Sequence, residues 1–226
     1  MTFTVKLIIS LLISAVISYL IGGLNSAIIS VKLLEGEDIR KHGSGNAGLT
    51  NTLRCFGKAP AICTLIGDLG KGVVAVLLSK LVLSLLVPSL EFTAFIGYFA
   101  GIFCIFGHVF PIYYGFKGGK GALVASSILL VVDPICFCII IPFFILVIII
   151  TKYVSVGSMT AAAVYPFLTF ALQYFAYGWG LRNSLVDSVL VMVTGAIIIY
   201  MHKENIKRLK EGTENKFSVK SKSKKS

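Results

Sequence analysis

Long apolar stretches alternate with short polar segments along this chain. A transmembrane helix needs about 20 apolar residues, because the hydrocarbon core is about 30 Å thick and each helical residue rises about 1.5 Å. Five stretches meet or approach this length, at residues 7–33, 59–87, 92–114, 159–177 and 184–200. They predict membrane-spanning helices. The first is read as an uncleaved span, because no convincing small-residue cleavage site follows it.

The apolar stretch at residues 122–150 is harder to interpret, because Asp133 and Pro134 fall near its middle and Pro142 follows. A single crossing would place Lys120 and Lys152 on opposite sides of the membrane, against the tendency of basic residues to stay on the cytoplasmic side. We therefore predict two short helices of about 12 to 15 residues each, packed as a hairpin inside the bundle. One kinked helix, and six spans in all, is the alternative.

The predicted fold is therefore an all-α integral membrane protein, a bundle of about seven transmembrane helices with the N-terminus outside and the C-terminus cytoplasmic. A hydrophobic content of 56%, a charged content of 14% and a mean hydropathy of +0.90 agree with this class. We expect a single transmembrane domain over residues 1–216 and a disordered, basic cytoplasmic tail over residues 217–226.

The net charge of +11 is concentrated in the C-terminal segment and in short loops beside apolar stretches. This distribution indicates membrane topology and contact with membrane lipids, and we expect no nucleic-acid partner. Five cysteines, without paired spacing, are interpreted as packing residues: Cys55, Cys63, Cys104, Cys136 and Cys138.

The first polar cluster is GSGNAGLTNTLR at residues 43–54. Gly43, Gly45 and Gly48 permit backbone turns in which successive N–H groups face an anion. Neutral side-chain donors and a guanidinium suited to phosphate oxygens accompany them: Ser44, Asn46, Thr50, Asn51 and Arg54. The cluster predicts a phosphate-binding loop, and a flexible turn between helices is the alternative.

The second polar cluster is GHVFPIYYGFKGGKG at residues 107–121. Lys117 and Lys120 supply mobile positive charge, and the glycines beside them allow a ligand to approach closely. These glycines are Gly118, Gly119 and Gly121. We predict a second phosphate site here, whereas His108 is expected to be structural.

Asp68 and Lys71 lie between these two clusters, three residues apart in an apolar context. We expect a structural ion pair rather than substrate contact, because either charge alone would be costly to bury.

The third polar cluster is HKENIKRLKEGTE at residues 202–214. His202, Asn205 and Arg208 recur every three residues and share one face of a predicted helix. His202 is a candidate general base or hydrogen-bond donor to a hydroxyl, and Glu214 is expected to anchor the segment by pairing with a basic neighbour. An amphipathic helix lying on lipid headgroups is the alternative.

In these three blocks the chain resembles the bacterial acyl-phosphate-dependent glycerol-3-phosphate acyltransferases, the PlsY family. The blocks, the DLGKG stretch at residues 68–72 and the YVSVGS stretch at 153–158 occur in the family's order. The last stretch adds Ser155 as a candidate substrate-binding residue. Leu49 and the GGLNS stretch at residues 22–26 depart from the family's usual pattern.

The resemblance implies transfer of a fatty acyl group from acyl phosphate to the sn-1 hydroxyl of glycerol 3-phosphate, giving lysophosphatidate and phosphate at the cytoplasmic face of the bacterial plasma membrane. It implies that Ser44 and Arg54 are essential, that the second block binds glycerol 3-phosphate, and that His202 and Asn205 position the attacking hydroxyl. We also expect Lys120 to contact phosphate. No cofactor or metal is expected, and a partner enzyme would supply the acyl phosphate.

Two other classes of function remain as alternatives. A transporter of an organic phosphate would predict an internal repeat, which the sequence lacks. A lipid-binding scaffold without activity would explain the basic tail but not three donor-rich blocks.

Overall fold

The computed structural model describes residues 2–89 and 94–217, and every regular element in these ranges is a helix. The long helices are α1 (Phe3–Gly23), α4 (Lys58–Leu86), α5 (Ala94–Val109), α7 (Pro134–Thr151), α8 (Val154–Ala171) and α9 (Leu181–Met201). The shorter α-helices are α2 (Ser26–Glu35), α3 (Leu49–Phe56), α6 (Ala122–Val132) and α10 (Lys203–Lys210). Single turns η1 (Ile39–Lys41) and η2 (Ile112–Tyr114) lie in the loops, and a π-helical turn, η3 (Leu172–Ala176), ends α8. The predicted all-α membrane class is confirmed.

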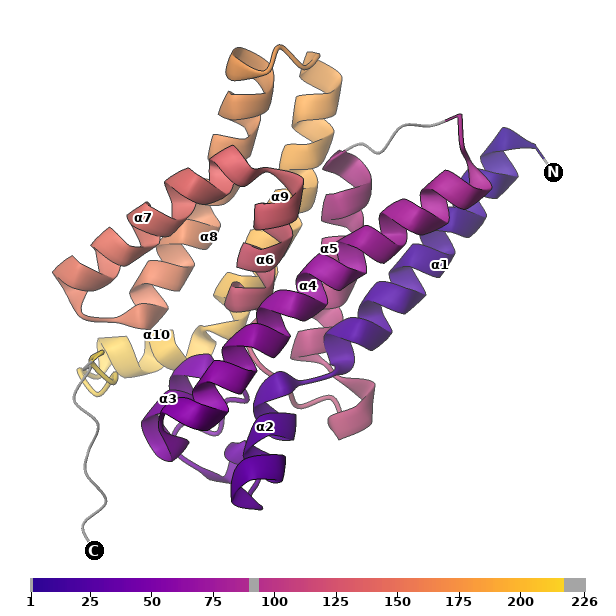
Figure 1. Cartoon of the computed structure of the whole chain (residues 1–226). Coiled ribbons are helices and arrows are strands. Elements are labelled where there is room, and N and C mark those ends of the chain that lie inside the picture. The colour runs from indigo at the N-terminus through magenta and orange to yellow at the C-terminus, as the bar shows by residue number, and fades with distance from the viewer. Residues whose placement is uncertain (1, 90–93, 218–226) are drawn as a thin grey trace, which may run out of the picture.

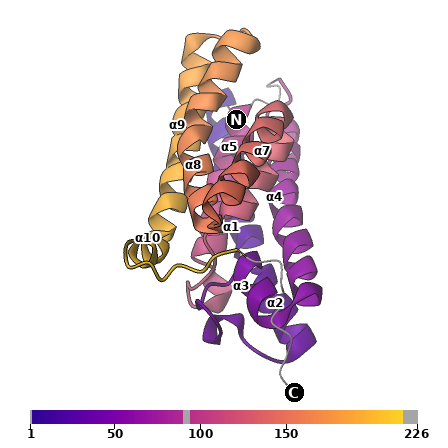
Figure 2. The same ribbon diagram turned by 90° about the vertical axis from the view of Figure 1, so that its left-hand side faces the viewer.

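The bundle has two sides, with α1, α4 and α5 packed together on one and α7, α8 and α9 on the other (Figure 1). The short helix α6 lies between them and packs on α4, α5 and α7. Helices α2, α3 and α10 gather at the end of the bundle opposite the start of α1, as both views show (Figures 1 and 2). All three polar clusters therefore lie at one end of the molecule.

Six helical segments in the described residues are long and apolar enough to span a membrane, and α6 is a shorter apolar helix. The two segments on either side of Asp133 are separate helices, as predicted, but their lengths differ from the prediction. α6 has 11 residues, whereas α7 has 18, so α7 alone is about 27 Å long. Pro142 lies inside α7 without ending it.

Asp133 makes the turn between α6 and α7. Its carboxylate caps α7 by accepting a hydrogen bond from the N–H of Cys136 at 3.0 Å, and Pro134 occupies the first helical turn. Asp133 also accepts a hydrogen bond from the Tyr177 hydroxyl at 2.8 Å, which satisfies part of its buried charge. The start of α6 and the end of α7 both lie next to the C-terminal segment. Lys120, just before α6, contacts Asn205, and the carbonyl of Lys152, just after α7, accepts the N–H of Phe217 at 2.7 Å.

The first predicted span is broken at Leu24, which has an extended backbone between α1 and α2. Asn25 caps α2 by accepting the N–H of Ile28 at 3.0 Å, and its amide donates to the carbonyl of Ala47 at 3.3 Å. The break follows from this capping, because an asparagine that bonds to nearby backbone groups competes with continued helix. It lies in the GGLNS stretch and attaches the first polar loop to the end of α1.

The predictions for the cysteines and for the C-terminal tail are only partly confirmed. Cys104 and Cys136 are buried, as expected of packing residues, but Cys55, Cys63 and Cys138 are exposed, so the packing interpretation is wrong for these three. Phe217, the first residue of the expected tail, is tied to Lys152. The rest of that tail lies outside the described residues.

Candidate active site

A cavity of about 450 Å³ opens where the three polar clusters meet. Ser44, Arg54, Lys120, His202 and Asn205 all lie in the wall of its polar end. From there the cavity extends between α6, α7 and α8, where its wall is apolar. That wall includes Leu129, Phe137, Ile140, Phe144, Ala161 and Tyr165. One space therefore joins a cationic, donor-rich end to a hydrocarbon-lined arm.

The first cluster is held in shape by Asn51, which is 2% exposed. Its side-chain oxygen accepts the N–H of Ser44 at 3.0 Å, and its amide donates to the carbonyls of His42 and Asn46 at 2.9 and 3.1 Å. Both amide hydrogens are thus already used within the loop, so Asn51 organises it. Asn51 also lies in the cavity wall, and its predicted contact with a ligand stays a prediction. Asn46 and Ser44 remain in the cavity wall.

The glycines of the first cluster differ in role. Gly43 and Gly45 have φ of 57° and 71°, the left-handed region that favours glycine. They shape the turn from outside the cavity wall, whereas Gly48, Thr50 and Arg54 line it.

Arg54 extends from α3 into this wall. Among the described residues, no hydrogen bond or ion pair engages its guanidinium, which leaves the fork available for an anion.

In the second cluster, two of the backbone N–H groups are bonded within the protein. The N–H groups of Gly118 and Gly119 donate to the carbonyls of Val109 and His108, both at 3.1 Å, so they cannot form an anion nest. These positions are glycine because a Cβ at either one would collide with His108. Lys117 is exposed and lies outside the cavity wall, whereas Lys120 and Gly121 line it.

The third cluster forms a hydrogen-bond network at the polar end. The Asn205 side-chain oxygen accepts from the ammonium of Lys120, and its amide donates to Glu214 at 2.6 Å. Glu214 also accepts from the Ser155 hydroxyl at 2.8 Å and from Arg208 at 2.7 Å. The predicted pairing of Glu214 with a basic neighbour is therefore confirmed. The Ser155 hydroxyl donates to Glu214 and so supports the network. Ser155 also lies in the cavity wall, and its predicted contact with substrate stays a prediction.

Two pKa shifts characterise this end. Burial, followed by the nearby positive charges of Arg208 and Arg54, lowers the pKa of Lys120 to about 8. Burial alone would raise the pKa of Glu214, but its hydrogen bonds with Asn205, Arg208 and Ser155 lower it below its ordinary value. The carboxylate is ionised at neutral pH and fixes α10 in place.

His202 lies at the start of α10 and is 4% exposed. Its Nδ1 lies 2.7 Å from the carbonyl oxygen of Ile198. A carbonyl can only accept, so Nδ1 carries the proton. Burial lowers the pKa of His202 to about 4, and the charge of Lys120 adds to this effect. The imidazole is therefore neutral at pH 7, and its Nε2 keeps a lone pair at the cavity wall.

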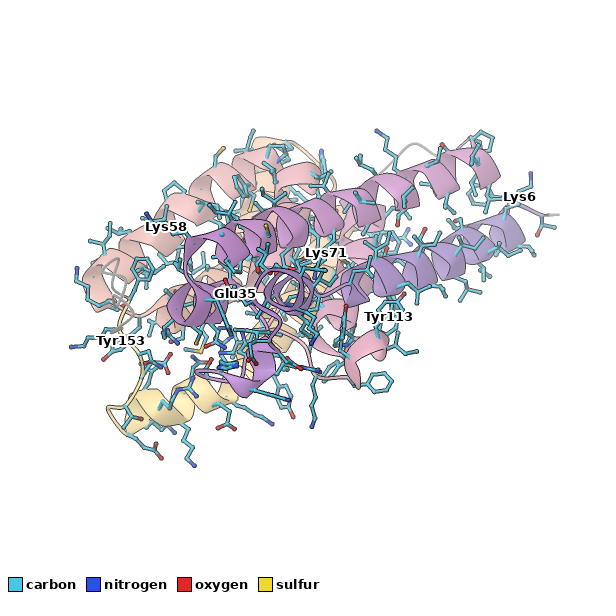
Figure 3. The ribbon with its side chains drawn as sticks, turned by 60° about the horizontal axis from the view of Figure 1, so that its bottom comes forward. Lys6, Glu35, Lys58, Lys71, Tyr113 and Tyr153 are labelled. Atoms are coloured by element: carbon cyan, nitrogen blue, oxygen red, sulfur yellow. The ribbon has the colours of Figure 1, made fainter. Side chains whose placement is uncertain are left out.

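Asp68 and Lys71 form the predicted buried ion pair, with Nζ 2.8 Å from Oδ1. Lys71 lies in the middle of the bundle in Figure 3, well away from Lys6 at the far end. Its ammonium also contacts the Leu24 carbonyl at 3.2 Å and His108 Nδ1 at 2.7 Å. This cluster joins α4, α5 and the break after α1. Asp68 and His108 also reach the cavity wall.

Two supporting contacts could not be foreseen from the sequence. Arg40 binds Asp38 at 2.7 Å and donates to the carbonyl of Tyr114 at 2.8 Å, which ties the first loop to the second. The hydrogen bond from Arg40 lowers the pKa of Asp38. The Asp-x-Arg spacing was the local signal for the ion pair, but nothing nearby in sequence indicates the contact with Tyr114.

Within the described residues, no group of three His, Cys, Asp or Glu side chains is placed to hold a metal.

The site and fold can be compared with known proteins. A sequence model of the family described as glycerol-3-phosphate acyltransferase matches residues 12–212. A glycerol-3-phosphate acyltransferase of Clostridioides difficile is 39% identical over 94% of this chain and 98% of its own length. One from Chlorobaculum tepidum is 37% identical over 90% of this chain and 94% of its own.

Solved structures agree with these sequence matches. The crystal structure of PlsY (YgiH), an integral membrane glycerol 3-phosphate acyltransferase, in its glycerol 3-phosphate form has a TM-score of 0.77 and 31% identity. It covers 93% of this chain and 96% of the other. The lysophosphatidic acid form of the same protein has a TM-score of 0.73 and 29% identity.

Proposed function

Because this chain belongs to the glycerol-3-phosphate acyltransferase family of integral membrane enzymes, we propose that it transfers a fatty acyl group from acyl phosphate to the sn-1 hydroxyl of glycerol 3-phosphate. The products are lysophosphatidate and inorganic phosphate. The observation that carries this proposal is the single cavity whose cationic end continues into an apolar arm. An acyl phosphate has the same two parts, a phosphate and a hydrocarbon chain.

The cationic end suits two phosphates held close together. Arg54, Lys120 and Arg208 line it. After burial, the positive charges of Arg208 and Arg54 contribute to the lowered pKa of Lys120, so these cations repel one another. Two bound phosphates relieve that repulsion, and the cations in turn offset the repulsion between the phosphates. Both reactants are thereby brought to one place, which accounts for much of the rate enhancement in transfer reactions.

The reaction needs no acyl-enzyme, because the leaving phosphate of an acyl phosphate already departs readily. The hydroxyl oxygen forms a bond to the acyl carbon, and the bond from that carbon to the phosphate oxygen breaks. We assign the hydroxyl proton to His202 Nε2, whose lone pair faces the cavity. Phosphates bound beside it favour the imidazolium and so raise its basicity at the moment of transfer. The proton then leaves with the phosphate.

The apolar arm between α6, α7 and α8 is the proposed acyl groove. Membrane orientation is argued from charge: the end that carries the site holds the basic loops and α10. Lys6, Lys80 and Arg182 lie towards the opposite ends of α1, α4 and α9. We propose that the site faces the cytoplasm. Glycerol 3-phosphate then enters from water, and the acyl chain enters from lipid. An enzyme that makes acyl phosphate would supply the donor.

The test is acyl transfer by purified protein given labelled glycerol 3-phosphate and either acyl phosphate or acyl-CoA. We expect lysophosphatidate with acyl phosphate only, acylated at the sn-1 position by NMR of the product. Equal use of acyl-CoA would refute the donor assignment. Movement of glycerol 3-phosphate into liposomes without acylation would instead support a transporter.

A further inference from the structure

His108 occupies an unusual position between the buried ion pair and the cavity. It lies near the end of α5, is 3% exposed, and forms part of the cavity wall. One edge of its ring faces Lys71, and its Nε2 atom faces Gly119 next to the carbonyl of Ala47. The ring therefore connects the interior of the bundle to the point where the first and second polar clusters meet.

The contact with Lys71 fixes the position of the proton on His108. An ammonium group has three N–H donors and no acceptor. The ammonium of Lys71 forms an ion pair with Asp68 at 2.8 Å, and its Nζ is 2.7 Å from His108 Nδ1. Nδ1 must therefore accept, which leaves the imidazole neutral with its single proton on Nε2. His202 has the opposite arrangement, because its Nδ1 donates to the Ile198 carbonyl.

The Nε2–H group of His108 forms no hydrogen bond with any residue that the structure describes. Because the ring is part of the cavity wall, an acceptor bound in the cavity can satisfy this donor. Gly119 lets the ring pack closely against the second cluster, since a Cβ there would collide with Nε2. Lys120, the next residue, places its ammonium in the same wall.

We propose that His108 binds substrate directly, donating its Nε2–H to an anionic oxygen of a bound phosphate, and that Lys71 holds it in the tautomer that can do so. This inference rests on the proposed phosphate-carrying substrates. A neutral donor suits the position, because Arg54, Lys120 and Arg208 already crowd positive charge at this end. His108 adds a hydrogen bond to phosphate without adding a fourth cation.

Nuclear magnetic resonance of histidine-labelled protein in lipid nanodiscs tests the tautomer directly. The chain has three histidines, and the proposal requires one neutral ring protonated at Nε2 and another protonated at Nδ1. Adding inorganic phosphate or glycerol 3-phosphate should shift the Nε2–H signal, and His108→Asn should remove it. A His108 ring that is doubly protonated at pH 7, protonated at Nδ1, or unaffected by both phosphates overturns the proposal.

A matched pair of substitutions tests the contact by kinetics. His108→Asn keeps an acceptor near Nδ1 for Lys71 but lacks a donor at Nε2, whereas His108→Gln places an amide N–H near Nε2. We expect His108→Asn to raise KM about 10- to 100-fold with kcat little changed, because a bond to a charged phosphate is lost equally from ground and transition states. His108→Gln should recover most of that loss.

Measuring KM separately for glycerol 3-phosphate and acyl phosphate shows which phosphate receives the bond. Unchanged KM for both substrates in His108→Asn overturns the proposal, as does an equal loss of kcat in both variants. Where the variants do not fold, the resonance of the wild-type ring still decides. Binding of inorganic phosphate is measured without turnover. A protein that fails to transfer acyl groups but shows the Nε2–H shift would refute the proposed function alone.

Discussion

The alkaline side of the pH profile should report the charge of Lys120. Its pKa is about 8, lowered by burial and then by Arg208 and Arg54. Above that pH the amine is neutral and no longer attracts phosphate, so activity is present below the pKa and lost above it. About half of the enzyme keeps the charge at pH 8, and about a tenth keeps it at pH 9.

The perturbation that tests this reasoning is Lys120→Arg. A guanidinium remains protonated throughout the range, so the variant should lose the alkaline limb even if its maximum rate is lower. The assay is kcat/KM for glycerol 3-phosphate from pH 7 to 10 at constant ionic strength. The second ionisation of a phosphate monoester has a pKa of about 6, so it is nearly complete over this range and does not produce the alkaline limb.

Lys207→Arg is the matched control, because Lys207 is exposed on α10 and lies outside the cavity wall. We expect it to keep the wild-type limb near pH 8 and the roughly fivefold fall over the next pH unit. A wild-type profile that stays flat to pH 9.5 (about 1.5 units above the expected midpoint) would refute the reasoning, and so would a limb near pH 8 that persists in Lys120→Arg.

Four further outcomes are expected. Arg54→Ala should abolish turnover while the protein still inserts in the membrane, because the free guanidinium fork at the cavity is lost; near-normal rates would remove it from the site. His202→Gln should lower kcat about 10²- to 10⁴-fold, as expected for loss of a general base. In the wild type, kcat/KM should show a fall below about pH 4, where His202 becomes protonated, in addition to the ionisation of the substrate phosphate at about pH 6. Ala161→Leu should narrow the apolar arm and shift preference towards shorter acyl phosphates, and an unchanged chain-length profile would place the acyl groove elsewhere. Lys71→Met should lower the free energy of unfolding by about 3–5 kcal/mol, because it leaves the carboxylate of Asp68 buried without its partner; adding Asp68→Asn should recover part of that loss in a thermal or denaturant unfolding assay.

Much of the fold could be read from hydropathy. Lipid offers no hydrogen-bond partners, so a long apolar segment must satisfy its backbone within a helix, and the prediction depends only on residues that are neighbours in sequence. That reasoning located the spans and the turn at Asp133. It failed at Leu24, where the helix ends. The side chain of Asn25 caps the next helix there, and Lys71, which is 47 positions away in sequence, donates to the carbonyl of Leu24.

The sequence also indicated which polar clusters gather at the site, since three donor-rich clusters on one side of a membrane protein have few other places to lie. What it could not determine is how each donor is used. Lys120 and Asn205 are 85 positions apart, and Lys71 and His108 are 37 apart. Only the packed bundle brings these pairs together. Only the structure shows that the side-chain amide of Asn51 and the backbone N–H groups of Gly118 and Gly119 already donate hydrogen bonds within the protein. Hydrophobicity and backbone pairing act locally along the chain, whereas the proton on a histidine and the reach of a cavity are set by whichever distant helices pack beside them.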